Sequence, residues 1–153
     1  MTTNLKEAMN SKEADVHLRE KIRKQGLSLG FDWVGFTGAT ENLTHQYYQK
    51  WLDEGFAGEM HYLHKHSPQK ASSQKVLDSA QTVIAVACNY FHDGTPAKKF
   101  QDSSRGRFSR YSMGEDYHLV LKDRLEEFRK WLLKEGLASG FEQTRVYVDT
   151  GPL

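Results

Sequence analysis

The sequence has little cysteine, little net charge and no long apolar run. Cys88 is its only cysteine, so the chain cannot form an internal disulfide or a metal cage of several thiolates. Twenty-one Lys and Arg against 20 Asp and Glu leave a net charge of +1, so any RNA contact must come from a local patch. No stretch approaches the roughly 20 apolar residues of a membrane helix, and residues 1–10 do not resemble a signal peptide. The default prediction is a cytoplasmic protein without a membrane partner.

Helical patterns alternate with short apolar runs that are typical of strands. We predict helices from about Ala14 to Gly30, around Leu43–Gly55 and from about Asp116 to Gly136, each closed by a glycine. Strands are predicted at residues 31–36, 82–90 and 143–149. Residues 82–90 are the most apolar run, which favours a strand covered on both faces, as in a parallel sheet. The sum is an α+β domain, a mixed sheet flanked by helices, over residues 14–153, with residues 1–13 as a flexible lead-in.

Asp149 ends the last predicted strand, and Thr150 and Gly151 follow it in a tight turn. Open α/β sheets place ligand-binding groups at the carboxyl ends of their strands. An aspartate that opens a turn by binding its own backbone explains the pattern equally well. The Asp-Thr-Gly half-site of an aspartic protease is disfavoured, because this motif has no room after it for a flap and substrate-binding strands.

The segment Gly106–His118 (GRFSRYSMGEDYH) concentrates polar and aromatic groups at the start of the longest predicted helix. Arginine can bind phosphate or carboxylate with its planar fork, and tyrosine or histidine can bind or protonate a polar ligand. Asp116 would also cap the helix, and His118 could simply be solvated. Taken together, the groups favour a binding site.

Two other features are interpreted as structural. His61, His64 and His66 do not have the spacing that places two imidazoles on one helix face, so a solvated surface is favoured over a metal site. Cys88 lies in the apolar run 82–90, where a small buried core residue is expected and no nearby charge would activate the thiol.

Five segments, in order and at natural spacing, resemble epoxyqueuosine reductase, the cobalamin and iron–sulfur enzyme that completes the queuosine base in transfer RNA. They are LGFDWVGF (29–36), GEMHYL (58–63), SAQTVIAVACNY (79–90), GRFSRYSMGEDYH (106–118) and VDTGPL (148–153). The similarity runs from about Val16 to Leu153. It implies the N-terminal part of a nitroreductase-like cobalamin-binding fold.

The resemblance also implies roles for individual residues. Asp149 matches the family's proposed proton donor to the substrate. Contacts with cobalamin are implied for Lys70, Ser109, Arg110, Tyr111, Asp149, Thr150 and Gly151. Lys70 stands where the family commonly has an arginine, and Lys75 competes for that role. Contacts with the substrate are implied for Asp116, Tyr117 and His118.

The family's two [4Fe–4S] clusters are bound by eight cysteines that lie beyond VDTGP. With one cysteine, this chain cannot ligate even one such cluster, and we expect it to carry no metal ligands of its own. The expected activity is reduction of epoxyqueuosine in a tRNA anticodon by a monomeric enzyme. We expect a truncated chain that is inactive alone.

Two alternatives remain open. The chain could be a non-catalytic α/β module that binds a corrinoid or a partner subunit. A cobalamin-dependent reductase of the dehalogenase type is less favoured, because the segments DYH and VDTGP match epoxyqueuosine reductase.

Overall fold

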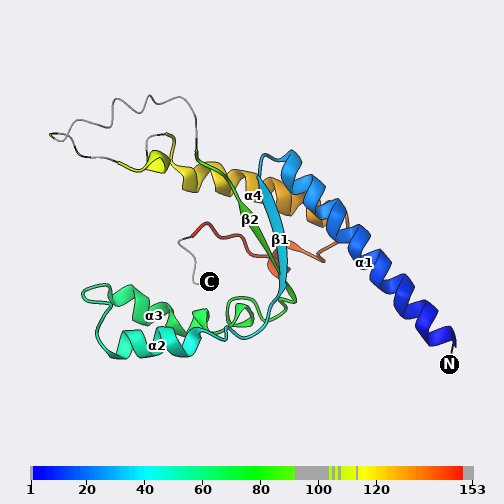
Figure 1. Cartoon of the computed structure of the whole chain (residues 1–153), viewed down its shortest axis with the longest axis horizontal. Coiled ribbons are helices and arrows are strands. Elements are labelled where there is room, and N and C mark those ends of the chain that lie inside the picture. The colour runs from blue at the N-terminus through cyan, green and yellow to red at the C-terminus, as the bar shows by residue number, and fades with distance from the viewer. Residues whose placement is uncertain (1, 92–103, 105, 107, 113, 150–153) are drawn as a thin grey trace. The chain divides into compact units, whose positions relative to one another are not determined.

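The computed structural model describes residues 2–91, 104, 106, 108–112 and 114–149 (Figure 1). Its helices and strands are α1 (Thr2–Ser28), β1 (Trp33–Gly38), α2 (His45–Asp53), α3 (His61–Lys70), β2 (Thr82–Ala87) and α4 (Tyr117–Lys134). Short 3-10 helices are η1 (Ser73–Lys75), η3 (Arg110–Ser112) and η4 (Phe141–Gln143). The predicted α+β class is confirmed. The chain forms two compact units, residues 1–34 with 86–128 and residues 35–85 with 129–153.

The core of the first unit lies where α1, the start of β1 and α4 pack together. Phe31, Val34 and Phe128 are buried, and the rings of Phe31 and Phe128 lie 6.3 Å apart. Gly26 of α1 sits against this cluster, because a Cβ built there would lie 2.5 Å from Cγ2 of Val34. Gly30 ends the helix with a φ of 86°, which confirms the predicted left-handed cap. Burial of these rings and methyl groups is the main stabilising contribution in this unit.

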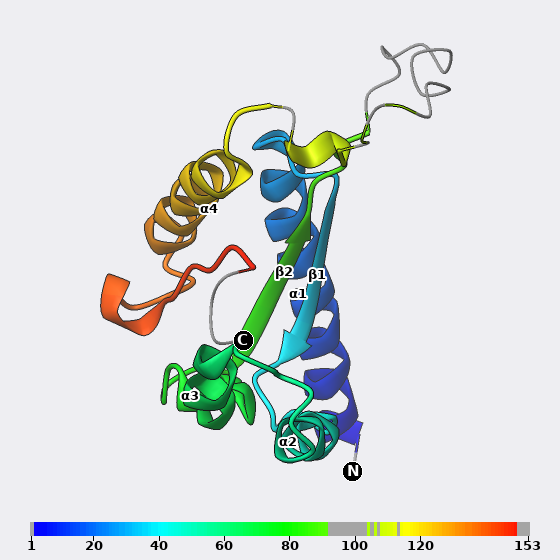
Figure 2. The same cartoon turned by 90° about the vertical axis from the view of Figure 1, so that its left-hand side faces the viewer.

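β1 and β2 form a two-stranded antiparallel sheet (Figures 1 and 2). In the first unit, the N–H of Asp32 donates to the carbonyl of Ala87 at 2.8 Å. In the second unit, the N–H of Ala39 donates to the carbonyl of Gln81 at 3.0 Å. From the first pair to the second, the residue number increases along β1 and decreases along β2, which is the pattern of antiparallel strands.

The prediction of a parallel strand covered on both faces is therefore wrong. β2 spans Thr82–Ala87, and its side chains are exposed or half-buried. An apolar, β-branched run suits a half-covered antiparallel strand as well as a covered parallel one, and periodicity does not separate the two.

The strand predicted at residues 143–149 is also wrong. Phe141–Gln143 form η4, and residues 144–148 continue outside any helix or strand. Thr144 does have extended backbone angles, φ −133° and ψ 148°. A strand also needs a hydrogen-bonded neighbour, and an alternating sequence does not specify one.

In the second unit, α2 and α3 lie side by side (Figures 1 and 2). Leu52 and Ala57 are buried, whereas Leu43 and Tyr47 are largely exposed. The Tyr48 hydroxyl donates to the carbonyl of Leu63 at 3.1 Å and joins the two helices.

The prediction of one helix from about Asp116 to Gly136 is confirmed by α4, in which Phe128 is buried. Gly136, with a φ of 69°, follows its end as predicted. At the other end of the chain, α1 begins at Thr2 and so includes residues predicted as a lead-in. Helical assignment does not report motion, so the flexibility of residues 1–13 stays a prediction. None of the helices in the described ranges is both long and apolar enough to cross a bilayer.

Candidate functional site

In the first unit, a row of aromatic rings in contact with one another extends to the N-terminus of α4, which we call the entrance of α4. The rings of Tyr90 and Tyr111 meet edge to face at 6.0 Å, and those of Tyr111 and Tyr117 do so at 5.6 Å. Tyr117 stacks on His118 at 4.1 Å. Tyr90 and Tyr111 remain about half exposed, so the chain presents ring surface to a ligand. The predicted residues Tyr111, Tyr117 and His118 are therefore brought together, and Tyr90 joins them.

Asp116 caps α4, which confirms the structural role predicted for it. Its Oδ1 accepts a hydrogen bond from the His118 backbone N–H at 3.0 Å and lies 2.9 Å from Nδ1 of the His118 imidazole. The hydrogen bond with the His118 side chain, followed by the one from its backbone, lowers the pKa of the Asp116 carboxyl below its usual value. The arrangement fixes a carboxylate–imidazole pair beside the aromatic rings. Such a pair can bind a polar group or hold a proton.

Ser109 and Arg110 lie just before these rings, at the start of η3. The carbonyl of Ser109 accepts hydrogen bonds from the Ser112 N–H at 3.1 Å and from the Ser112 hydroxyl at 2.7 Å. Ser109 itself is exposed. The tight turn therefore fixes the backbone of the segment predicted to border the cofactor and leaves the Ser109 hydroxyl accessible.

Asp149 lies in the second unit, exposed, just after residues 144–148, which are outside any helix or strand. Arg129 anchors the start of this segment: its Nε donates to the Thr144 hydroxyl at 2.6 Å, and its Nη2 donates to the carbonyl of Phe141. The Arg129 guanidinium also covers the Phe141 ring at 4.3 Å. Asp149, the predicted acid, thus follows a segment that is hydrogen-bonded to the part-buried Arg129 of α4. No sequence signal indicated Arg129.

The two lysines proposed for the cofactor also lie in the second unit. Lys70 is half-buried in the last turn of α3, with its ammonium 5.8 Å from the centre of the Tyr48 ring. Lys75 is exposed at the end of η1. Because the ammonium of Lys70 has a fixed aromatic neighbour, its position is the better defined of the two. Thr150 and Gly151 lie outside the described residues.

Cys88 differs from its prediction. It is half-buried just beyond β2, and its thiol donates to the carbonyl of Gly30 at 3.6 Å. Nη1 of Arg124 lies 3.7 Å from the Cys88 sulfur and donates to the same Gly30 carbonyl at 3.0 Å. The expectation that no charge lies nearby was wrong, because Arg124 comes from α4, far along the sequence. The cluster joins the end of α1, the end of β2 and α4.

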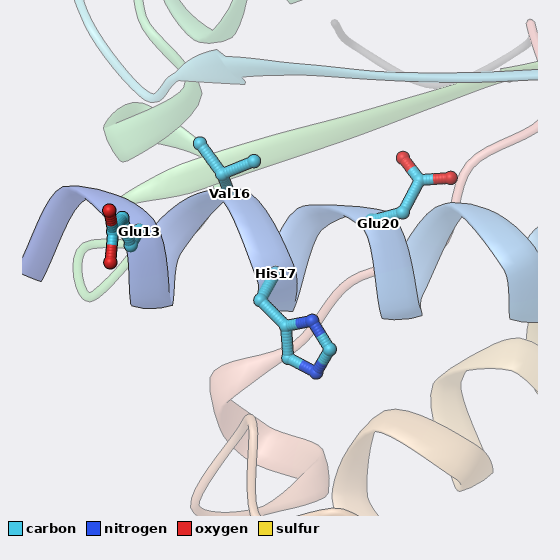
Figure 3. Close-up of a pocket in the computed structure, with 4 residues that line it drawn as sticks. All are labelled: Glu13, Val16, His17 and Glu20. Carbon is cyan, nitrogen blue, oxygen red and sulfur yellow. The ribbon is translucent and has the colours of Figure 1, made fainter. Parts of the chain in front are cut away.

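The three histidines lie on α3, with His61 and His64 exposed and His66 half-buried. Across the described residues, no group of three or more His, Cys, Asp or Glu side chains has the geometry to hold a metal ion. A shallow depression on α1 is lined by Glu13, Val16, His17 and Glu20 (Figure 3). His17 points away from Val16 and Glu20, and all four side chains are exposed on a single helix, so they do not converge on a ligand.

Comparison with known proteins gives a consistent family. The family model described as "Epoxyqueuosine reductase QueG, DUF1730" matches residues 70–150, just over half of the chain. The chain belongs to this family. Three relatives named epoxyqueuosine reductase come from Atelocyanobacterium thalassa (33% identical), Escherichia coli K12 (31%) and Gloeobacter violaceus (35%). The matches cover 89%, 89% and 87% of this chain, respectively.

The same alignments cover 42%, 35% and 40% of those three relatives. The chain therefore spans about two fifths of the length of the relatives that it matches. No solved structure matches it. The family match includes both the aromatic entrance of α4 and Asp149, the two regions that the sequence predicted as functional.

Proposed function

We propose that this chain carries part of the catalytic site of an epoxyqueuosine reductase that acts on tRNA in the cytoplasm. The observation that carries the proposal is the family match over residues 70–150, because that range contains both candidate regions. The reaction converts an epoxide to an alkene with loss of water, which consumes two electrons and two protons. The protein must therefore hold the modified base, deliver protons and receive electrons.

Asp149 is the proposed proton donor. Protonation of the oxygen as its bond to carbon breaks avoids release of an alkoxide, which is general acid catalysis. Two features support the choice: the carboxyl is exposed, and the segment before it is anchored by Arg129 at Thr144 and Phe141. An acid held on a fixed segment loses less freedom when the substrate binds.

Asp116, Tyr117 and His118 are the proposed substrate contacts. The Asp116 carboxylate orients the His118 imidazole at 2.9 Å, and the Tyr117 ring stacks on it at 4.1 Å. An oriented imidazole can donate to a hydroxyl or carbonyl of the base, and a tyrosine ring offers a flat face to it.

Cobalamin is the proposed cofactor, and the chemistry of the described residues is compatible with it. The exposed Ser109, the half-exposed Tyr111 ring and the hydrogen-bonded turn of η3 support the proposal, because they place a hydroxyl and an aromatic ring together at the surface. Arg110 in η3, Lys70 on α3, and Thr150 and Gly151 after Asp149 complete the proposed contacts. When bound, cobalamin would supply the electrons for the reduction.

Iron–sulfur clusters do not fit this chain. A [4Fe–4S] cluster of the ferredoxin type needs four thiolates, and the sequence has one cysteine, half-buried beside Arg124. Electrons for the proposed reaction must therefore enter from a donor outside this chain, and we propose that the chain alone does not turn over.

The test uses the full chain, cob(II)alamin and a chemical reductant that replaces the missing electron donor. Absorbance titration should show cobalamin binding by the wild-type chain and by Asp149→Asn. With reductant and RNA containing epoxyqueuosine, the wild type should form queuosine and Asp149→Asn should not. Glu142→Gln, another exposed acid of the same unit, is the matched control and should behave as the wild type. Equal product from Asp149→Asn would refute the role of Asp149.

A non-catalytic corrinoid-binding or partner-binding module is the second candidate. The single cysteine favours it, because these 153 residues cannot hold the four-thiolate cluster that would carry electrons to the cofactor. Tight cobalamin binding without turnover under a strong reductant would support this candidate. No cobalamin binding by the folded chain would refute the corrinoid part of both proposals.

A further inference from the structure

Four aromatic rings form a surface on the α2–α3 hairpin of the second unit, away in sequence from the entrance of α4. Tyr48 stacks on Trp51 with ring centres 6.2 Å apart and planes 15° apart. Trp51 stacks on Phe56 at 6.5 Å and 25°. Tyr62 joins the group from α3, because the Tyr48 hydroxyl donates to the carbonyl of the next residue, Leu63, at 3.1 Å. In agreement, Tyr62 helps to raise the pKa of the Tyr48 hydroxyl, after the larger effect of burial. We name Tyr48, Trp51, Phe56 and Tyr62 the α2–α3 aromatic surface.

This surface is open to solvent at both ends. Phe56 is 62% exposed and Tyr62 is 58% exposed, whereas Tyr48 and Trp51 are half-buried. Isolated exposed aromatic residues are ordinary, but stacked neighbours that continue from half-buried rings form a contiguous apolar area, which indicates a binding surface. The half-buried pair also holds the exposed ring of Phe56 in a defined orientation.

Positive charge borders these rings. Helix α3 (HYLHKHSPQK) contains Lys65, Lys70 and three histidines, with no Asp or Glu. The Lys70 ammonium lies 5.8 Å from the centre of the Tyr48 ring, and Lys65 is exposed. Two acidic residues of α2 and its end are already engaged: Glu54 pairs with Lys50 at 3.7 Å, and Asp53 accepts a hydrogen bond from Gln49 at 2.9 Å. Glu59, before α3, is the remaining carboxylate of this hairpin.

We propose that the α2–α3 aromatic surface binds single-stranded RNA, with bases stacking on Phe56 and Tyr62 and phosphates near Lys65. Stacked rings flanked by cations match a ligand that carries both flat bases and negative charge. Two other ligands explain the surface less well. An apolar helix of a partner protein would use the rings but not the cations, and an acidic peptide would use the cations but not the stacked rings. The choice of RNA over DNA rests on the proposed function. The proposal that the surface binds a single-stranded nucleic acid rests on the rings and cations alone.

The test measures binding of a fluorescein-labelled oligouridine to the full 153-residue chain by fluorescence anisotropy. Phe56→Ala and Tyr62→Ala should each weaken binding by about tenfold or more, because loss of one stacked base contact has roughly this effect. Tyr62→Phe keeps the ring and should bind within about twofold of the wild type. Far-UV circular dichroism checks the fold of each variant, and either alanine variant alone suffices to decide.

Lys65→Gln should reduce the salt dependence of binding by about 0.7 in the slope of log K against log salt, as expected for one lost phosphate contact. Lys134→Gln, at the exposed end of α4, is the matched control and should leave the slope unchanged. No RNA binding by the folded chain, or wild-type affinity of either folded alanine variant, overturns the proposal. So does equal binding of polyglutamate, or displacement of the RNA by cobalamin.

The outcomes separate this proposal from the proposed catalytic site. Asp149→Asn should bind the oligouridine as the wild type does, and Phe56→Ala should bind cobalamin as the wild type does. Loss of RNA binding with cobalamin binding intact therefore refutes only the RNA surface. Loss of cobalamin binding with RNA binding intact refutes only the cofactor proposal.

Discussion

Replacement of Gly26 by alanine should destabilise the protein, although alanine is the better helix former. In an open helix, Gly→Ala gains about 0.5–1 kcal/mol. At this position, however, the new Cβ would lie 2.5 Å from Cγ2 of Val34 and 3.5 Å from Cζ of Phe128. Val34 is 1% exposed and cannot move into solvent, so α1 or β1 must shift. Overpacking of this kind costs about 1–3 kcal/mol, which leaves a net loss of up to about 2.5 kcal/mol.

A double-mutant cycle with Val34→Ala tests this reasoning. Val34→Ala alone should cost about 2 kcal/mol, because it removes two buried methyl carbons and leaves a small cavity. It also removes the Cγ2 atom that meets the new methyl group. On this background Gly26→Ala should therefore become neutral or stabilising by up to about 1 kcal/mol, which gives a coupling of roughly 2 kcal/mol.

Urea unfolding, followed by circular dichroism, measures all four stabilities. Gly→Ala at Gly106, where no atom lies within 4 Å of the new Cβ, controls for the loss of glycine itself. Equal effects of Gly26→Ala on both backgrounds would refute the proposed contact between α1 and β1. Stabilisation by Gly26→Ala alone would show that the helix does not pack closely against Val34.

Three further predictions follow from single contacts. Loss of the imidazole in His118→Ala should raise the pKa of the Asp116 carboxyl toward its usual value, measured by carboxyl-carbon NMR. Because the pKa of Asp116 is lower in the folded state, its pairing with His118 stabilises the fold at pH values above the unfolded pKa, and this stabilisation is lost as the pH falls through the folded pKa. Tyr62→Phe should lower the raised pKa of Tyr48, measured by ultraviolet titration of tyrosinate. Because the pKa of Tyr48 is higher in the folded state, its contribution to stability is complete at pH values below the unfolded pKa and is lost as the pH rises through the folded pKa. Arg129→Ala should cost about 1–3 kcal/mol in urea unfolding, and Arg129→Lys should recover only part of it because lysine lacks the planar fork; an unaffected Arg129→Ala variant would contradict the anchoring role.

Helix ends were predictable from the sequence, because their determinants are local. Gly30 and Gly136 lie at positive φ just after α1 and α4, and Asp116 caps α4 with its own side chain. Each of these features depends on residues within one helical turn. The strands were less predictable, because the alternating residues 143–149 have the composition of a strand without a hydrogen-bonded neighbour.

The candidate site was predictable only as a group of residue types. The segment 106–118 predicted a cluster of tyrosine, histidine and aspartate, and Tyr111, Tyr117, His118 and Asp116 do meet there. Its fourth ring, Tyr90, comes from the end of the apolar run 82–90 and was interpreted as part of a strand. Arg124 beside Cys88 could not be predicted, since 36 residues separate the two.

The sequence by itself determined the family, the α+β class and the shortage of thiolate ligands, because ordered motifs, local periodicity and a residue count need no coordinates. Only the tertiary structure decided that β2 is antiparallel and half-covered, that Arg129 holds the segment before Asp149, and that Tyr48, Trp51, Phe56 and Tyr62 form one surface. These features depend on which side chains and strands meet in space. Their energies depend on packing and hydrogen bonding across space, which the order of residue types does not specify.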